Sequence, residues 1–307
     1  MKNSRQNNTV TRKKSKKVKR LAWRIALVTV FALQAVAFAV TGARAMTQTL
    51  QKDPAIVIAA FGTTTKAGVT YEYFDALLKN KLPAQYKNYR IVWAFTSEIV
   101  RERVNKKFAE QGVARRYRSL AQTLADLEDE GYRKVVVQPL HIFPGQEYDD
   151  VLKVVAAFRT LGLRIELGGS LLHKWKWMFE AVSALQNEFL APDEGCNILV
   201  THGSPLTFPG SNSAYIGLDR YVRHKYGNVF VGSVEGVLTR EQALDLARAY
   251  PKKRVRFIPF LYVAGEHIMK DIMGRKIDDE GRSSWAMEMQ QAGFAVDTVY
   301  TTYQGKK

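Results

Sequence analysis

The chain of 307 residues contains a single cysteine, Cys196, so it can form neither an intrachain disulfide nor a thiolate-rich metal site. It also lacks the G-x-G-x-x-G and G-x-x-x-x-G-K-[ST] loops that bind nucleotides, and the G-x-S-x-G turn of serine hydrolases. We therefore expect no nucleotide cofactor. Cys196 precedes an apolar run and is expected to be a small core residue.

Acidic residues are missing from the start of the chain. The formal net charge is +17, but residues 1–45 hold eleven Lys and Arg and no Asp or Glu, which leaves +6 for residues 46–307. A charge of that size needs no nucleic acid to explain it, so we expect no nucleic-acid partner.

Residues 1–45 have the layout of a secretory signal peptide. A basic stretch runs to Arg24, and an apolar run of 16 residues follows at 25–40. The small residues Ala43 and Ala45 then stand three and one positions before the expected cleavage point. The apolar run is short for a membrane span, which needs about 20 residues. We expect cleavage after Ala45 and a periplasmic protein, since export without disulfides fits a bacterial periplasm. The alternative is an uncleaved anchor that leaves the same domain outside the membrane.

From residue 54 onward, short apolar runs alternate with longer amphipathic ones. This alternation predicts an α/β fold with parallel sheets covered by helices on both faces. Strands are expected at 55–61, 90–95, 134–140, 163–167, 197–201, 229–234, 254–260 and 295–300. Helices are expected near 69–81, 98–107, 117–130, 147–160, 174–189, 212–225, 239–249, 266–273 and 284–291. The segment LAPDEG at 190–195 is the expected boundary between an N-terminal lobe at 46–190 and a C-terminal lobe at 191–307.

The two halves match each other at three places in the same order. Residues 139–148 align with 259–268, residues 59–65 with 199–205, and residues 94–98 with 232–236. We therefore predict two similar, doubly wound parallel-sheet lobes, derived from an internal duplication, around a central cleft. All the matched segments lie at the carboxyl ends of strands, where open parallel sheets bind ligands.

Three side chains of the second half are candidate metal ligands. His202, Glu235 and His267 each follow a different predicted strand. Two imidazoles and one carboxylate suit a divalent first-row metal with open coordination positions. Each residue could instead cap a helix or bind a loop, and there is no H-E-x-x-H pattern, so the prediction depends on their joint placement.

The loops at 61–65 and 202–205 each join a strand to a helix. Glycine allows a tight turn there, and free amides and hydroxyls at a helix start favour an anion, although ordinary helix capping by Thr or Ser is the commoner role. His141 ends a strand of the first half and is a second-site candidate, whereas His173 and His224 are expected on the surface.

These residues also resemble a family. The segments FGTTT, AFTSEIVR, QPLHIFPGQEY, THGS, VGSVEG, PFLYVAGEHIMKDI and SWAMEMQQAGF are similar to those of the anaerobic sirohydrochlorin cobaltochelatases (CbiK type), in the same order from about residue 54 to 300. The resemblance implies a metal chelatase of cobalamin or sirohaem-type biosynthesis. It inserts Co(II), with Fe(II) as the other possibility, into sirohydrochlorin or a similar anionic tetrapyrrole, and it needs no nucleotide. Because cytoplasmic relatives lack an export segment, this chain is similar to a periplasmic branch.

The resemblance also implies roles for individual residues. His202 and His267 match the two essential histidines, and Glu235 matches the carboxylate that joins them at the metal. Glu147 matches the acidic residue that faces them from the other lobe. Independently of the resemblance, the internal duplication puts Phe61 and Glu147 at the positions of His202 and His267. The expected substrate-binding residues are Phe61, Thr63, Thr64, His141, Glu147 and Ser204.

Two other functions stay open on the sequence alone. One is a periplasmic tetrapyrrole or haem carrier without catalysis, in which His141 or another histidine would be an axial iron ligand. The other is a plain metal-binding protein. For the chelatase and for both alternatives, we expect an oligomer of identical chains.

Overall fold

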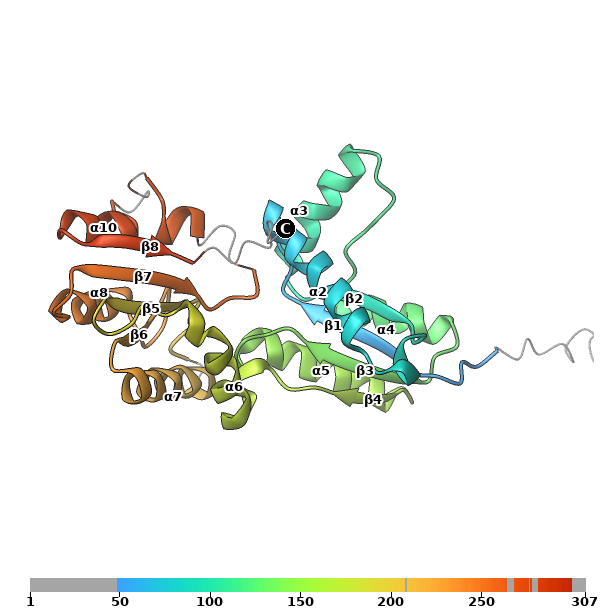
Figure 1. The fold of residues 1–307 in the computed structure, drawn as a ribbon. Helices are drawn as coiled ribbons and strands as arrows, with labels where there is room; N and C mark the ends of the chain where they lie inside the picture. The colour runs from blue at the N-terminus through green and yellow to red at the C-terminus, as the bar shows by residue number, and fades with distance from the viewer. Residues whose placement is uncertain (1–48, 208, 264–267, 276, 278–280, 300–307) are drawn as a thin grey trace, which may run out of the picture. The chain divides into compact units, whose positions relative to one another are not determined.

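In the part of the chain that the structure describes, eight parallel strands form two four-stranded sheets (Figure 1). The computed structural model describes residues 49–207, 209–263, 268–275, 277 and 281–299. The N-terminal sheet has the order β2-β1-β3-β4, with strands Ile91–Phe95, Ala55–Ala60, Lys134–Pro139 and Arg164–Leu167. The C-terminal sheet has the order β6-β5-β7-β8, with strands Val229–Ser233, Cys196–Thr201, Arg254–Pro259 and Ala295–Thr298. The predicted α/β class and all eight predicted strands are confirmed.

Helices connect the strands, and several begin at a capping side chain. They are α2 (Val69–Lys81), α3 (Glu98–Glu110), α4 (Leu120–Asp129), α5 (Gln146–Thr160), α6 (Trp175–Leu185), α7 (Pro209–Tyr226), α8 (Arg240–Ala249) and α10 (Trp285–Gln291). Ser119 and Thr239 form capping boxes with Gln122 and Gln242, which is why α4 begins at residue 120 rather than at the predicted 117. The helix predicted at 266–273 lies partly outside the described residues. Its described part, Ile268–Ile272, is a single π-helical turn.

Each sheet is covered by helices on both faces, because alternate residues of a strand point to opposite sides. In β1, Val57 and Ala59 pack with α4 and α5, whereas Ile58 and Ala60 pack with α2. Burying one such aliphatic side chain contributes about 1.5–3 kcal/mol, so the two-sided burial explains why these strands are continuous apolar runs.

In the C-terminal sheet, Cys196, Ile198 and Val200 of β5 pack with α8 and α10, whereas Leu199 packs with α6 and α7. Cys196 is fully buried, as expected of a core residue. Helix α6 precedes the predicted boundary at 190–195 but packs against this second sheet. The core of the C-terminal sheet therefore includes chain from both sides of that boundary.

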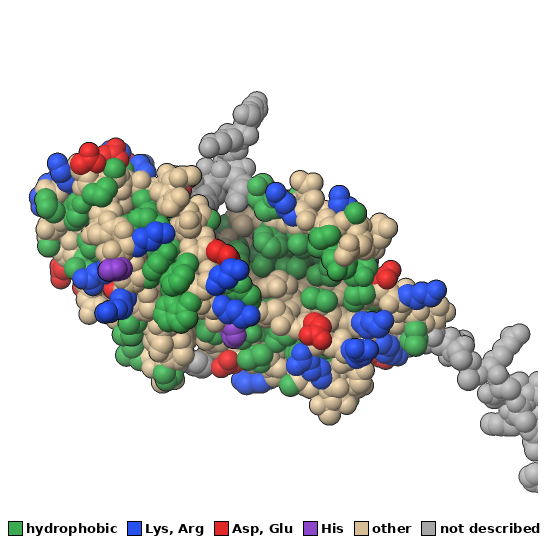
Figure 2. Space-filling view, turned by 60° about the horizontal axis from the view of Figure 1, so that its bottom comes forward, with side chains coloured by type: hydrophobic (Ala, Val, Ile, Leu, Met, Phe, Trp, Pro, Cys, Tyr) green, Lys and Arg blue, Asp and Glu red, His purple; other side chains and the backbone are tan. Residues whose placement is uncertain are grey.

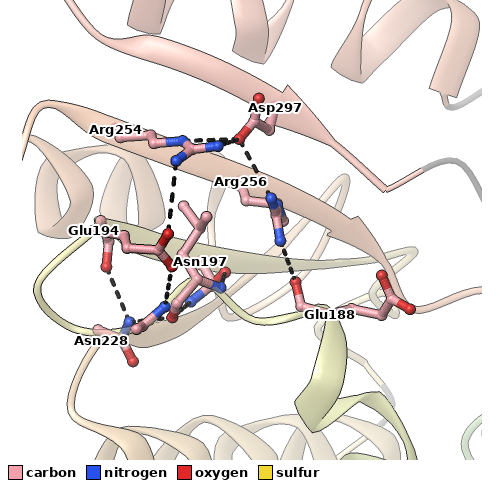
Figure 3. Close-up of polar contacts among 10 residues, drawn as sticks. Glu188, Glu194, Asn197, Asn228, Arg254, Arg256 and Asp297 are labelled. Atoms are coloured by element: carbon pink, nitrogen blue, oxygen red, sulfur yellow. Dashed lines mark hydrogen bonds and ion pairs between the residues drawn. The ribbon is translucent and has the colours of Figure 1, made fainter.

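Buried amides and ion pairs fix the amino-terminal ends of the C-terminal strands (Figure 3). Asn197 accepts a hydrogen bond from the Leu190 amide at 2.8 Å and donates to the Leu190 carbonyl at 3.1 Å. Asn228 donates to the same carbonyl at 2.8 Å. Between β7 and β8, Arg254 contacts Asp297 at 2.7 Å. The segment before β5 is thus held to the sheet at the end remote from the carboxyl ends of the strands.

The backbone hydrogen bonds of the two sheets correspond residue by residue. Ser97 N donates to Phe61 O at 3.2 Å, and Glu235 N donates to His202 O at 3.0 Å. Leu140 N donates to Ala59 O in the same way that Phe260 N donates to Val200 O. The fold duplication predicted from the sequence is therefore present in the topology and in the register.

One detail of the sequence alignment is wrong. The register pairs Ala59 with Pro139 and Val200 with Pro259, so Ala59 corresponds to Val200 and not to Leu199. The overlay of 59–65 on 199–205 is thus shifted by one residue, because short apolar runs look alike in either register. With the shift corrected, Phe61 corresponds to His202 and Gly62 to Gly203.

The predicted signal segment at 1–45 lies outside the described residues. Within the described part of the chain, no helix is both long enough and apolar enough to cross a membrane.

Candidate active site

A pocket of about 380 Å³ lies at the carboxyl ends of strands from both sheets. Its walls come from the loops that follow β1, β3, β5, β6 and β7. All the described candidate residues of the sequence line this pocket: Phe61, Thr63, Thr64, His141, Glu147, His202, Ser204 and Glu235. The structure thus brings together side chains that are far apart in the sequence.

His202 and Glu235 face each other on the C-terminal wall of the pocket. The distance from His202 Nδ1 to Glu235 Oε1 is 3.5 Å, and each side chain is 46% exposed. Both are therefore positioned by the fold and still accessible from the pocket. An imidazole nitrogen and a carboxylate oxygen at this separation can ligate one divalent metal ion.

The third predicted ligand, His267, lies outside the described residues. Among the residues that the structure does describe, no group of three or more His, Cys, Asp and Glu side chains is placed to hold a metal. The described part of the site is therefore the His202–Glu235 pair.

The pair depends on a close approach of two backbone segments. Val234 N donates to Thr201 O at 3.0 Å, and the bond from Glu235 N to His202 O continues the β5–β6 pairing beyond the strands. Gly203 has φ +88°, and a Cβ at this position would lie 1.6 Å from Glu235 O. Only glycine fits at this position, both for its dihedral angle and for the space available.

Hydrogen bonds behind the wall hold these loops in place. Tyr215 of α7 is buried, and its hydroxyl bonds to the Gly203 backbone and to Thr201, whose own hydroxyl lies 2.7 Å from that of Ser233. Burial raises the pKa of Tyr215, so its hydroxyl stays protonated. Ser204 is also buried, and its hydroxyl lies 2.9 Å from that of Ser211. That hydroxyl is thus already engaged in holding the loop.

The opposite wall has the same backbone but different side chains. Phe61, at the position of His202, is 45% exposed. Thr63 accepts a hydrogen bond from Thr65 N at 3.2 Å, which shapes the loop, and Glu147 lies in the first turn of α5. Tyr71 of α2 accepts a hydrogen bond from Gly62 N at 3.0 Å, as Tyr215 does from Gly203.

Sequence reasoning missed these two tyrosines. Each tyrosine lies on the inner face of the helix that follows a glycine-containing loop. A tyrosine at the buried face of such a helix is the sequence feature that could have identified them.

His141 is a polar residue where the other sheet has an apolar one. It is 8% exposed, and burial lowers the pKa of its imidazole to about 4. Its Nε2 lies 3.4 Å from Thr96 Oγ1, and its Nδ1 has no hydrogen-bond partner among the described residues. By the backbone correspondence, Leu261 replaces His141 and Val234 replaces Thr96 in the C-terminal sheet. The fold itself therefore does not require a histidine at this position.

The fold and the His–Glu pair define an α/β protein that can hold a divalent metal on one wall of a pocket. Bacillus subtilis SirB with Fe3+ has a similar fold, with a TM-score of 0.50 and 11% identity over 81% of this chain and 88% of that one. At this identity the likeness concerns the fold alone.

Residues 54–306 match the family Cobalt chelatase (CbiK), and the chain therefore belongs to that family. It is 30% identical over 244 residues to the sirohydrochlorin cobaltochelatase CbiKC of Nitratidesulfovibrio vulgaris, which covers 78% of this chain and 80% of the relative. It is 26% identical over 246 residues to the sirohydrochlorin cobaltochelatase of Salmonella typhimurium, with 78% and 85% covered.

The close approach at Gly203 predicts a specific effect of adding one methyl group. Gly203→Ala should lower the affinity for Co²⁺ by about tenfold or more, because the Glu235 backbone must move away from His202. Calorimetric titration with Co²⁺ measures this. The matched control is Gly227→Ala, since Gly227 also has positive φ (+71°) but has no atom near its Cβ position. Equal Co²⁺ affinities in the two variants would show that the approach does not position the pair.

The buried imidazole predicts a pH dependence of stability. Since the pKa of His141 is about 4 in the folded chain and about 6.5 when unfolded, the unfolded state binds more protons between these values. The free energy of unfolding should therefore fall by up to about 3 kcal/mol as the pH drops from about 6.5 to about 4.

His141→Leu, which installs the residue of the other sheet, should reduce this fall, as measured by urea unfolding at several pH values. His224→Leu, which removes an exposed histidine of α7, should leave it in place. The assignment to His141 is wrong if both variants behave alike.

Proposed function

We propose that this protein is a sirohydrochlorin cobaltochelatase, which inserts Co(II) into the tetrapyrrole and releases two protons. The observation that carries the proposal is the accessible His202–Glu235 pair on the wall of a pocket, in a chain of the cobalt chelatase family. The curated relatives that it matches are sirohydrochlorin cobaltochelatases, and they are matched over most of their length.

In this proposal the metal is a substrate that is held briefly. His202 and Glu235, on the C-terminal wall, bind Co(II) together with His267, and neutral imidazoles are suited to this because their ordinary pKa is near 6.5. Thiolates would bind the ion too tightly for transfer, and the one thiol of the chain, Cys196, is buried in the core.

The macrocycle is proposed to lie between the two walls. Phe61 offers an exposed aromatic face opposite the metal pair, and His141 lines the same wall. The loop of Thr63 and Thr64 offers amides or hydroxyls to peripheral carboxylates, and the loop of Ser204 offers amides. As the pyrrole nitrogens bind the metal, their two protons pass to an acceptor. We assign this role to one of the metal-site histidines, assisted by Glu147.

Removal of the proposed ligands tests the function. His202→Ala and His267→Ala should each lower the rate of cobalt insertion about 10²-fold or more, since each removes a metal ligand that is also a possible proton acceptor. The assay is anaerobic insertion into sirohydrochlorin, followed by absorbance and run with Co²⁺ and with Fe²⁺. His224→Ala is the control, because this histidine is exposed on α7 and does not line the pocket. Unchanged insertion in the first two variants would refute the assignment.

We further propose that the chain is exported and cleaved after Ala45, on the basis of the basic and apolar pattern of residues 1–45. Expression of the full chain should yield a periplasmic protein whose amino-terminal sequence begins MTQTLQK. Recovery of uncleaved protein from the membrane fraction would instead support an anchor, and recovery of the full chain from the cytosol would contradict export.

A further inference from the structure

The described walls of the pocket present no cation to an anionic substrate. Among its described lining residues there is no Lys or Arg, and the acidic side chains there are Glu147 and Glu235. A tetrapyrrole with several carboxylates brings a large negative charge to these walls. The described walls therefore supply no positive charge that would attract these carboxylates.

A groove of about 780 Å³ lies between α3 and the segment 111–119. We call it the α3 groove. Five cationic side chains and two acidic ones line it: Arg101, Lys106, Arg115, Arg116, Arg118, Glu98 and Glu102. Its net charge is thus positive, in contrast to the pocket.

The segment opposite α3 is fixed by specific contacts. The Tyr117 ring stacks on Phe95 with a centroid distance of 3.7 Å and meets Phe108 edge-on at 5.8 Å. Asn105 of α3 donates to Tyr117 O at 3.0 Å and accepts from Tyr117 N at 2.7 Å. The backbone that carries Arg115 and Arg116 is therefore held against the helix.

Three of the cations have no ion-pair partner among the described residues. Arg118 contacts Asp126 at 3.4 Å, and Arg101 donates to the carbonyl oxygens of Phe95 and Thr96. Within the part of the chain that the structure describes, no carboxylate lies within ion-pair distance of Lys106, Arg115 or Arg116, and all three are exposed. Like charges gathered on a fixed frame repel one another, and an anion bound among them relieves that repulsion.

The groove and the pocket share the first turns of α3. This helix begins after Ser97, which corresponds to Glu235 of the metal wall. Val100 lines the pocket, whereas the next residue, Arg101, lines the groove. An anion attracted to the groove is therefore brought next to the pocket.

We propose that the α3 groove binds carboxylates of the incoming tetrapyrrole, through Lys106, Arg115 and Arg116, and delivers it to the pocket. Guanidinium groups pair with carboxylates through two parallel hydrogen bonds, which suits a ligand with several such groups. The effect is electrostatic capture, so it raises the rate of productive encounter and leaves the chemical step unchanged. The proposal rests on the function proposed above.

The test is a charge-neutral triple variant of the full chain, Lys106→Gln, Arg115→Gln and Arg116→Gln. At low ionic strength kcat/KM for cobalt insertion into sirohydrochlorin should fall about tenfold or more, and the difference should shrink at high salt. The value of kcat should not change.

The matched control, Lys176→Gln, Arg220→Gln and Lys225→Gln, removes the same charge from exposed positions on α6 and α7. This control is needed because Lys and Arg side chains are spread widely over the face that Figure 2 draws, so the loss of any three positive charges could slow the encounter with an anionic substrate. Equal kcat/KM in the two triple variants would overturn the proposal.

A binding measurement separates this proposal from the proposed function. Fluorescence titration without metal compares an octacarboxylate porphyrin with a dicarboxylate one. The groove variant should bind the octacarboxylate more weakly and the dicarboxylate unchanged. If the unaltered chain shows that difference but inserts no cobalt, the proposed function fails and the groove stands. If the chain inserts cobalt and the groove variant binds both porphyrins as the unaltered chain does, the groove proposal fails alone.

Discussion

The site depends on one close backbone contact, between Gly203 and the carbonyl group of Glu235. The contact extends the parallel pairing of β5 and β6 by two residues beyond the sheet, so that the loops leave the strands together. His202 and Glu235 are carried on these paired loops, which hold His202 Nδ1 3.5 Å from Glu235 Oε1. Behind the wall, the Tyr215 hydroxyl bonds to the Gly203 backbone, and the hydroxyls of Ser204 and Ser211 lie 2.9 Å apart.

The duplicated fold uses one backbone frame for two different walls. By the backbone correspondence, His202 and Glu235 of the C-terminal wall are replaced by Phe61 and Ser97 in the other wall. Thr96 and His141 are in turn replaced by Val234 and Leu261. The two walls therefore differ in chemistry at each of these places, while the loops that carry them are alike. Such an arrangement permits one wall to bind metal and the other to accept an aromatic ring.

Most of the fold could be predicted from the sequence, because the central strands β1 and β5 are apolar over most of their length and the helices between the strands each bury an apolar face. The clustering of the strand-end residues followed from the parallel topology. The sequence did not reveal the burial of His141, whose carbonyl accepts a hydrogen bond from Leu171 N at 2.9 Å, nor that α6 joins the second core. The α3 groove was also missed, because a net charge summed over residues 46–307 hides a local cluster.

The burial of Cys196 has a practical consequence. Burial raises the pKa of this thiol to about 12, so it remains protonated and does not compete for soft metal ions. A cysteine introduced on the surface would be the chain's one readily alkylated thiol. Spectroscopic labels can therefore be attached one at a time at the rim of the pocket, on a protein that needs no prior removal of native cysteines.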